Sequence, residues 1–355
     1  MKDILANIKK LKDITKINKK ISCVFIGNTA QKEKNSYYVT PIRSNNNFIF
    51  FSIIIYSNII AKKIAKLLDG NIDFIFVDIE KKIQTSAKNL RKNELINIEK
   101  TVKDIVKKTK LRVYKANDLT ILAAETLINY YYLKDQRGIG GKKIAIIGAG
   151  NLGFKLALKL LESGAITYLF RRNRFYLKNL VKSLNIIKPK GTLSSAYYLR
   201  NIPDNLNNFD VIIGCSDTKN IIKIKNVKNI VDKKLLIDLG KGTFSKESIY
   251  NLLKKNIYIY RLDITSSYLS FLENTLFTEK IYGNLVYINK IKEFTFVSQG
   301  ILGRANDIIV DNPQNPKKIF GVCDGKGNLN RCSKNQKKKI VNNIFKKIGF
   351  KIIYD

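Results

Sequence analysis

Short apolar runs alternate with helix-like patterns over the first 114 residues. The runs at 22–27, 48–56 and 73–78 are continuous and apolar, as in strands buried on both faces. Residues 59–68 and 98–108 carry helical patterns, and 111–114 is a further candidate strand. Residues 1–20 form a basic amphipathic pattern that we interpret as a solvated packing helix. Strands that alternate with helices predict an α/β domain.

Helical patterns and apolar runs continue to alternate after residue 119. A helical stretch at 119–133 leads through the glycine-rich segment 138–141 into an apolar run that starts at 142. Further candidate strands lie at 166–170, 210–214, 235–239 and 257–262, and a basic helix is expected near 334–347. We therefore predict an α/β fold: an N-terminal α/β domain (1–118) for substrate or oligomerisation, a doubly wound parallel Rossmann domain (119–281) and a C-terminal segment (282–355) that folds back.

Three glycines follow the apolar run at 142–147 in the spacing G-x-G-x-x-G, and a helical pattern begins directly after them. This order of strand, glycine turn and helix is the fingerprint of a dinucleotide-binding βαβ unit. The first glycine allows the tight turn, the second lets the pyrophosphate approach the backbone, and the third allows close packing of helix on strand. The predicted cofactor-binding residues of the turn are Gly148, Ala149, Gly150, Asn151, Leu152 and Gly153.

The segment after the second strand of this unit indicates which dinucleotide binds. NAD sites usually carry an acidic residue there that binds the ribose hydroxyls, but no carboxylate lies between residues 166 and 180. Arg171, Arg172 and Asn173 stand there instead, and guanidinium groups suit a 2′-phosphate. The sequence therefore favours NADP as the cofactor, with NAD left open because basic residues are frequent throughout the chain.

Small and polar residues follow two later strands, at the edge of the sheet where ligands bind. We expect Cys215, Ser216 and Gly240 to contact the cofactor near its nicotinamide half. Cys215 is a candidate nucleophile, but a free cysteine at a strand end is more often a packing residue.

Composition narrows the function further. The chain has 355 residues, 45% of them hydrophobic, so it can bury a large core and divide into two domains. The net charge is +37 at pH 7. Lysines are spread along the whole length and no nucleic-acid-binding signature accompanies them, which argues against nucleic acid as the main partner.

The histidine and cysteine contents restrict the chemistry and the cellular location that we expect for the protein. No histidine is present, so acid–base chemistry falls to Lys, Asp, Glu, Tyr or Cys, and there is no histidine ligand for a metal. The four cysteines are scattered, which fits a reduced protein and predicts no metal site. The most apolar window, 48–56, is too short to span a membrane, and 1–5 does not begin a signal peptide. We predict a soluble cytoplasmic protein.

At this point the chain resembles a known family between residues 115 and 242. Lys115-Ala116-Asn117-Asp118 at the head of a helix, the glycine turn, and Arg172-Asn173-Arg174 after the second strand are similar to shikimate/quinate dehydrogenases and to the NAD(P) domain of glutamyl-tRNA reductases. The resemblance implies a Lys and an Asp as the polar pair on the substrate hydroxyl. It places Asp118 in the Asp position. Glutamyl-tRNA reductase activity is not expected, because it needs a histidine.

The lysine of the pair is less defined, because the family's usual context for it is missing. Lys81, Lys82 and Lys115 are the candidates. We take Lys115 and Asp118 as catalytic, and Asn117 and Gln299 as substrate contacts. A competing interpretation is that Asn117 or Asp118 simply caps the helix while Lys115 is solvated.

These observations predict an NADP-preferring oxidoreductase that transfers hydride to or from a small carbonyl or hydroxyl substrate. Two alternatives remain: a non-catalytic dinucleotide-binding module and a basic polyanion binder on a Rossmann scaffold. A homodimer is also left open. The sequence does not name the substrate.

Overall fold

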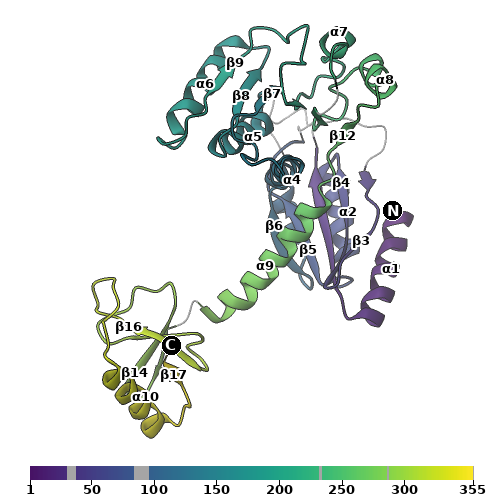
Figure 1. Ribbon diagram of the computed structural model, residues 1–355. Coiled ribbons are helices and arrows are strands. Elements are labelled where there is room, and N and C mark those ends of the chain that lie inside the picture. The colour runs from purple at the N-terminus through teal and green to yellow at the C-terminus, as the bar shows by residue number, and fades with distance from the viewer. Residues whose placement is uncertain (30–36, 84–95, 232–233, 286–287, 355) are drawn as a thin grey trace. The chain divides into compact units, whose positions relative to one another are not determined.

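The computed structural model describes residues 1–29, 37–83, 96–231, 234–285 and 288–354 (Figure 1). The chain divides into two compact units, Met1–Leu269 and Ser270–Asp355. Among the described residues the first unit contains two six-stranded sheets and the second contains one five-stranded sheet.

The first sheet lies in the N-terminal part of the first unit, with strand order β2-β4-β1-β5-β6 and β3 paired on β4. Strands β1, β4, β5 and β6 are parallel, whereas β2 and β3 run antiparallel to β4. The elements are α1 (Lys2–Asn18), β1 (Ile21–Asn28), β2 (Tyr37–Val39), β3 (Arg43–Ser44), β4 (Phe48–Ile55), α2 (Asn58–Leu68), β5 (Phe74–Asp78), α3 (Ile98–Ile105) and β6 (Lys110–Tyr114).

Alternate residues of these strands face two different cores, which is why the strands read as continuous apolar runs. On one face Val24 and Ile26 pack with the buried side chains of α1, α2 and α3. On the other face Phe25 stacks on Phe76, with ring centroids 4.7 Å apart. Tyr268, in the first turn of α9 (Thr265–Leu285), lies 4.4 Å from the Phe25 ring. The start of α9 therefore covers the second face of this sheet.

The second sheet has the strand order β12-β11-β10-β7-β8-β9, and every pair is parallel. If β7 is counted as strand 1 and the sheet is read from β9 to β12, the order is 3-2-1-4-5-6, which is the order of a Rossmann sheet. Its elements are α4 (Ala116–Tyr131), β7 (Lys143–Ile147), α5 (Asn151–Glu162), β8 (Ile166–Phe170), α6 (Arg174–Ile187), β9 (Ala196–Tyr198), β10 (Val211–Gly214), α7 (Ile224–Val227), β11 (Leu235–Asp238), α8 (Lys246–Lys254) and β12 (Ile259–Arg261).

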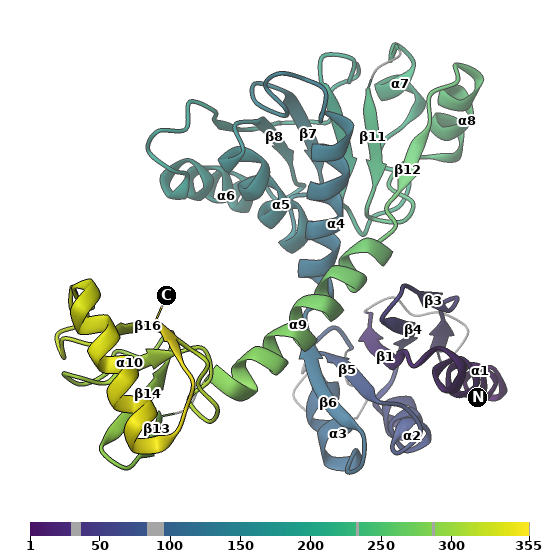
Figure 2. The same cartoon turned by 60° about the horizontal axis from the view of Figure 1, so that its bottom comes forward.

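Both faces of this sheet are covered by helices (Figure 2). In β7, Ile144 and Ile146 join the core formed with α4, α5 and α6, whereas Ala145 and Ile147 join the core on the side of α7 and α8. The sheet is therefore doubly wound, and the predicted mixed α/β fold with a parallel Rossmann sheet is confirmed.

The C-terminal unit contains β13 (Ile288–Ile291), β14 (Phe294–Ser298), β15 (Ile308–Val310), β16 (Lys318–Val322), α10 (Lys334–Ile348) and β17 (Ile353–Tyr354), with strands in chain order across the sheet. Ile344 of α10 packs on Phe296 and Val310 of the sheet. Helix α9 runs without interruption past residue 281. The predicted division at 118 and 281, and the folding back of the C-terminal segment, stay predictions.

Candidate functional site

The glycine turn between β7 and α5 has the geometry that its sequence predicts. Gly148 has φ +114°, and a Cβ there would lie 2.5 Å from the backbone nitrogen of Ser216. A Cβ on Gly153 would lie 2.6 Å from the carbonyl oxygen of Gly148, so α5 packs tightly on the turn. A Cβ on Gly150 would meet no atom within 4 Å. The turn is therefore closed around the first and third glycines and open at the second, as approach by a pyrophosphate requires.

Helix α5 begins at this turn with Gly150 as its N-cap, which has no side chain to occupy the helix end. The amides of Ala149 and Gly148 are bonded to the carbonyl of Phe170. Asn151, Leu152 and Gly153 form the first helical turn, whose amides have no intrahelical acceptor. With the positive end of the helix dipole, these amides suit an anion.

Two arginines that follow β8 donate hydrogen bonds to the glycine turn and to the loop after β10. Arg171 donates from Nη1 to the carbonyl oxygen of Ala149 at 3.1 Å. Arg172 donates from Nη2 to Oγ1 of Thr218, in the loop after β10, at 3.1 Å. Asn173 is the N-cap of α6, where its Oδ1 accepts from the amide of Tyr176 at 3.1 Å. Its oxygen therefore caps the helix, and its side-chain NH2 group is of the type that can donate to a ligand.

The loops after β10 and β11 close the same edge of the sheet. Ser216 accepts from the amide of Thr218 at 3.1 Å. Gly240 lies so close to this loop that a Cβ on it would be 2.2 Å from the carbonyl oxygen of Ser216. Burial, and secondarily the charge of Asp238, raises the pKa of Cys215. A protonated thiol that packs on the Rossmann core fits the packing interpretation rather than a nucleophile.

Helix α4 begins earlier than the sequence predicts, and the capping interpretation of its first turn is wrong. The helix starts at Ala116. Lys115 occupies the N-cap position, but its side chain makes no capping hydrogen bond. Asp118 instead pairs with two lysines, Lys155 at 2.8 Å and Lys115 at 3.8 Å. The structure thus brings the predicted Lys115 and Asp118 together and leaves Asp118 half exposed.

Carboxylates from the end of β5 cap this helix, which the sequence did not indicate. Asp78 accepts from the amide of Ala116 at 3.4 Å, and Glu80 accepts from the amide of Asn117 at 3.2 Å. The two partners are nearly forty residues apart in sequence, so no local pattern marks them. The only sequence signal is a pair of acids directly after a buried strand.

Asp78 and Glu80 also hold Lys82, one of the candidate catalytic lysines. Its Nζ lies 2.7 Å from Glu80 and 3.3 Å from Asp78. Asn28, at the end of β1, donates to Asp78 at 3.2 Å. Burial raises the pKa of Asp78, and the charge of Lys82 opposes that rise. Lys82 therefore neutralises a buried acid, and Lys81 is exposed.

Lys155 is a site residue that the sequence analysis missed. It stands one turn into α5, and its bond to Asp118 ties the glycine-turn helix to the head of α4. One α-helical turn is about 5.4 Å, so Asp118 lies near the turn predicted to hold the cofactor. Gln299 is exposed at the end of β14 in the C-terminal unit, and its predicted contact with the substrate stays a prediction.

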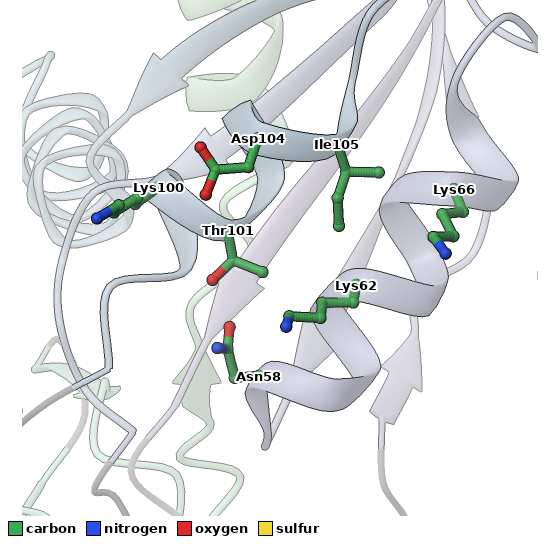
Figure 3. Close-up of a pocket in the computed structure, with 7 residues that line it drawn as sticks. All are labelled: Asn58, Lys62, Lys66, Lys100, Thr101, Asp104 and Ile105. Carbon is green, nitrogen blue, oxygen red and sulfur yellow. The ribbon is translucent and has the colours of Figure 1, made fainter. Parts of the chain in front are cut away.

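Two surface cavities among the described residues are lined by residues outside the glycine turn. One of about 430 Å³ opens between α2 and α3, where Lys62 extends toward Asn58 and Thr101 (Figure 3). Another of about 660 Å³ is lined by Tyr132, Asp210 and Lys142, near the amino ends of the Rossmann strands. Neither is lined by a residue of the glycine turn.

Residues 133–263 match the family model described as shikimate/quinate 5-dehydrogenase. The match covers the Rossmann sheet and confirms the resemblance inferred from the sequence for this segment; it does not reach back to Lys115 and Asp118. No curated protein matches the chain. The match supports a general assignment to the NAD(P)-dependent oxidoreductases, with a nicotinamide dinucleotide as cofactor.

Several solved structures are similar to the chain at low identity. A dipicolinate synthase structure from Bacillus halodurans is 14% identical with a TM-score of 0.36, covering 73% of this chain and 97% of its own. The dipicolinate synthase structure from Bacillus subtilis is 11% identical with a TM-score of 0.35, covering 73% and 96%. L-tryptophan dehydrogenase from Nostoc punctiforme is 12% identical with a TM-score of 0.36, covering 59% and 57%. We draw no functional conclusion from these likenesses.

None of the helices among the described residues combines the length and the hydrophobicity needed to cross a bilayer. The cytoplasmic location stays a prediction.

Proposed function

We propose that this protein is an NADP-preferring dehydrogenase that acts on a small carbonyl or hydroxyl compound. One observation carries the proposal: the guanidinium of Arg171 is bonded to the backbone of the glycine turn itself, at Ala149. Arg172 reaches the loop after the neighbouring strand β10. Two guanidinium groups thus flank the place where the adenosine ribose of a dinucleotide lies in a Rossmann domain.

The residues of the turn fit a dinucleotide. The open space over Gly150 admits a pyrophosphate, and the first-turn amides of α5 provide donors for its oxygens. The bound cofactor would supply or accept the hydride. No acidic residue stands after β8 to bind a free 2′-hydroxyl, which supports NADP over NAD.

On the substrate side, Asp118 and Lys115 take the roles of orienting group and proton donor. The carboxylate of Asp118 is half exposed and can accept a hydrogen bond from a substrate hydroxyl. The ammonium of Lys115 lies 3.8 Å from it and can give a proton to a carbonyl oxygen during reduction. Asn117, beside them and half buried, can donate from its amide to the same substrate.

The cofactor assignment is tested by calorimetric titration of the full chain with NADPH and NADH. We expect NADPH to bind more tightly, and Arg171→Ala and Arg172→Ala each to weaken NADPH by about 10- to 100-fold, from the loss of a charge-assisted bond. Lys182→Ala removes one positive charge from an exposed position on α6 and serves as the control. Equal affinity for NADH and NADPH, unchanged in both arginine variants, would remove the NADP assignment.

The catalytic assignment is tested by NADP⁺ reduction with shikimate and quinate as probes. Lys115→Ala and Asp118→Ala should each lower kcat by at least about 100-fold while the Kd for NADPH changes by less than about tenfold. Asp135→Asn, at a partly exposed ion-paired residue beyond the far end of α4, is the control. Normal turnover in both variants would remove the pair. NADPH binding without turnover of these or other hydroxy acids would favour the non-catalytic module instead.

The same proposal also implies which partners we expect for the protein. A small-molecule substrate is expected and nucleic acid is not, and a homodimer is left open for light scattering to decide.

A further inference from the structure

Helices α4 and α5 are joined by an apolar seam with two ion pairs on its border. Ile121, Ala124 and Ile128 of α4 share one core with Leu156 and Leu160 of α5. The ion pairs are Lys155–Asp118 at 2.8 Å and Lys159–Glu125 at 3.3 Å.

The two ion pairs differ in what their helix positions connect. Lys155 and Asp118 both stand within the first five residues of their helices. A helical side chain leans toward the N-terminus of its own helix, so the stem of Lys155 points back toward the glycine turn. Lys159 and Glu125 stand farther along and connect only the bodies of the helices. Of these two ion pairs, the first therefore joins the helix start at the turn predicted to hold the cofactor to the head of α4.

We propose that Lys155 is a positioning residue that couples occupancy of the glycine turn to the order of the α4 head, where Lys115, Asn117 and Asp118 stand. The inference rests on the proposed function, because it takes the glycine turn as a dinucleotide site. A dinucleotide that fixes the start of α5 fixes Lys155. Lys155 in turn holds Asp118 in the orientation that the substrate meets.

The energetics favour coupling over a role in stability. The side chains of Lys155 and Asp118 are 33% and 52% exposed, and exposed pairs contribute about 1 kcal/mol or less to folding. The hydrogen bond that Lys155 donates to Asp118 is the main cause that raises the pKa of Lys155, so the ammonium stays charged at neutral pH. An ion pair of this kind can couple the conformation of the α5 start to that of the α4 head while barely changing the free energy of unfolding.

Amide hydrogen exchange of the full chain with and without NADPH tests the coupling without any substrate. In the wild type we expect NADPH to slow exchange at the glycine turn and also, by at least about fivefold, at Ala116–Asp118. Lys155→Gln should keep the slowing at the glycine turn and lose it at α4. Lys155→Arg, which keeps the charge, should restore it. Lys159→Gln is the matched control and should behave as the wild type.

The outcomes separate this inference from the proposed function. NADPH that binds and protects the turn but leaves α4 unchanged in the wild type overturns the coupling alone. Equal behaviour of Lys155→Gln and Lys159→Gln also overturns it, because the pair is then only structural. A wild type that binds no NADPH overturns the proposed function and the coupling together.

Discussion

The carboxylate of Asp78 accepts a hydrogen bond from the backbone amide of Ala116, so the end of a strand in the first sheet caps the helix that leads into the Rossmann sheet. Asp78 is fully buried and also accepts from Asn28 and from the ammonium of Lys82. One side chain thereby fixes the relation between a strand end, a helix start and a lysine.

Removal of this carboxylate should be costly. Asp78→Ala removes one buried acceptor from the Lys82 ammonium, the Asn28 amide and the backbone amide of Ala116, while Glu80 still accepts from Lys82 and Asn28, and we expect a loss of about 2 kcal/mol in the free energy of unfolding. Urea denaturation measures it. Asp204→Ala breaks an exposed pair with Lys225 and should cost less than about 1 kcal/mol. Similar values for the two variants would show that the buried cluster contributes little.

The second glycine of the turn should matter for the cofactor and not for the fold. A Cβ at Gly150 meets no protein atom, so Gly150→Ala should fold like the wild type and bind NADPH at least about tenfold more weakly. Gly191→Ala, at another glycine with open space around it, is the control. Thermal unfolding and NADPH titration separate the two effects. Unchanged NADPH affinity in Gly150→Ala would contradict the turn as the pyrophosphate site.

The four cysteines should differ in reactivity. Cys23 and Cys323 are buried, whereas Cys215 and Cys332 are partly exposed, and burial raises the pKa of Cys215 and of Cys23. Iodoacetamide at pH 8, followed by mass spectrometry of the native protein, should label Cys332 first. Cys215→Ala should retain turnover. Preferential labelling of Cys215, or loss of turnover in its variant, would restore it as a nucleophile candidate.

The start of α9 should lose stability in acid. Asp263 accepts from the hydroxyl of Thr265 at 2.6 Å and from its amide at 2.9 Å, and these bonds lower the pKa of Asp263. A lowered carboxyl pKa stabilises the fold above the unfolded value of about 3.9, and the contribution is lost as the pH falls through the folded pKa.

Asp263→Asn should therefore reduce the free energy of unfolding at pH 7 by less than about 1 kcal/mol, since the group is exposed. The difference from the wild type should shrink as the pH falls below about 4 in urea denaturation. A difference that grows over that range would have the wrong sign for a depressed pKa.

The sequence predicted those parts of the fold whose signal is local. The run at 142–147, the three glycines and the helix after them are contiguous, so periodicity and turn chemistry suffice to define the unit. The helix expected at 334–347 agrees with α10 within one residue. In contrast, no strand was predicted at β16, because its five residues stand among many turn residues.

Contacts between distant segments of the candidate site could not be predicted from the sequence. Lys155 and Asp118 are 37 residues apart, and Asp78 and Ala116 are 38 apart, so their meeting depends on how the sheets and helices assemble. Composition hides such lysines further. With 65 Lys and Arg in the chain, no single basic residue stands out until its partner is known.

The Rossmann sheet also has a consequence for the order of events during synthesis. Its two central strands, β7 and β10, meet through residues 67 positions apart, such as Lys143 and Asp210, while β8 and β9 add on the other side. Until residue 214 has left the ribosome, β7 stands as an open edge beside the glycine turn. Closure of so long a loop makes parallel pairing slow. The nascent chain therefore depends on β10 to cover this open edge, which could otherwise pair with another chain.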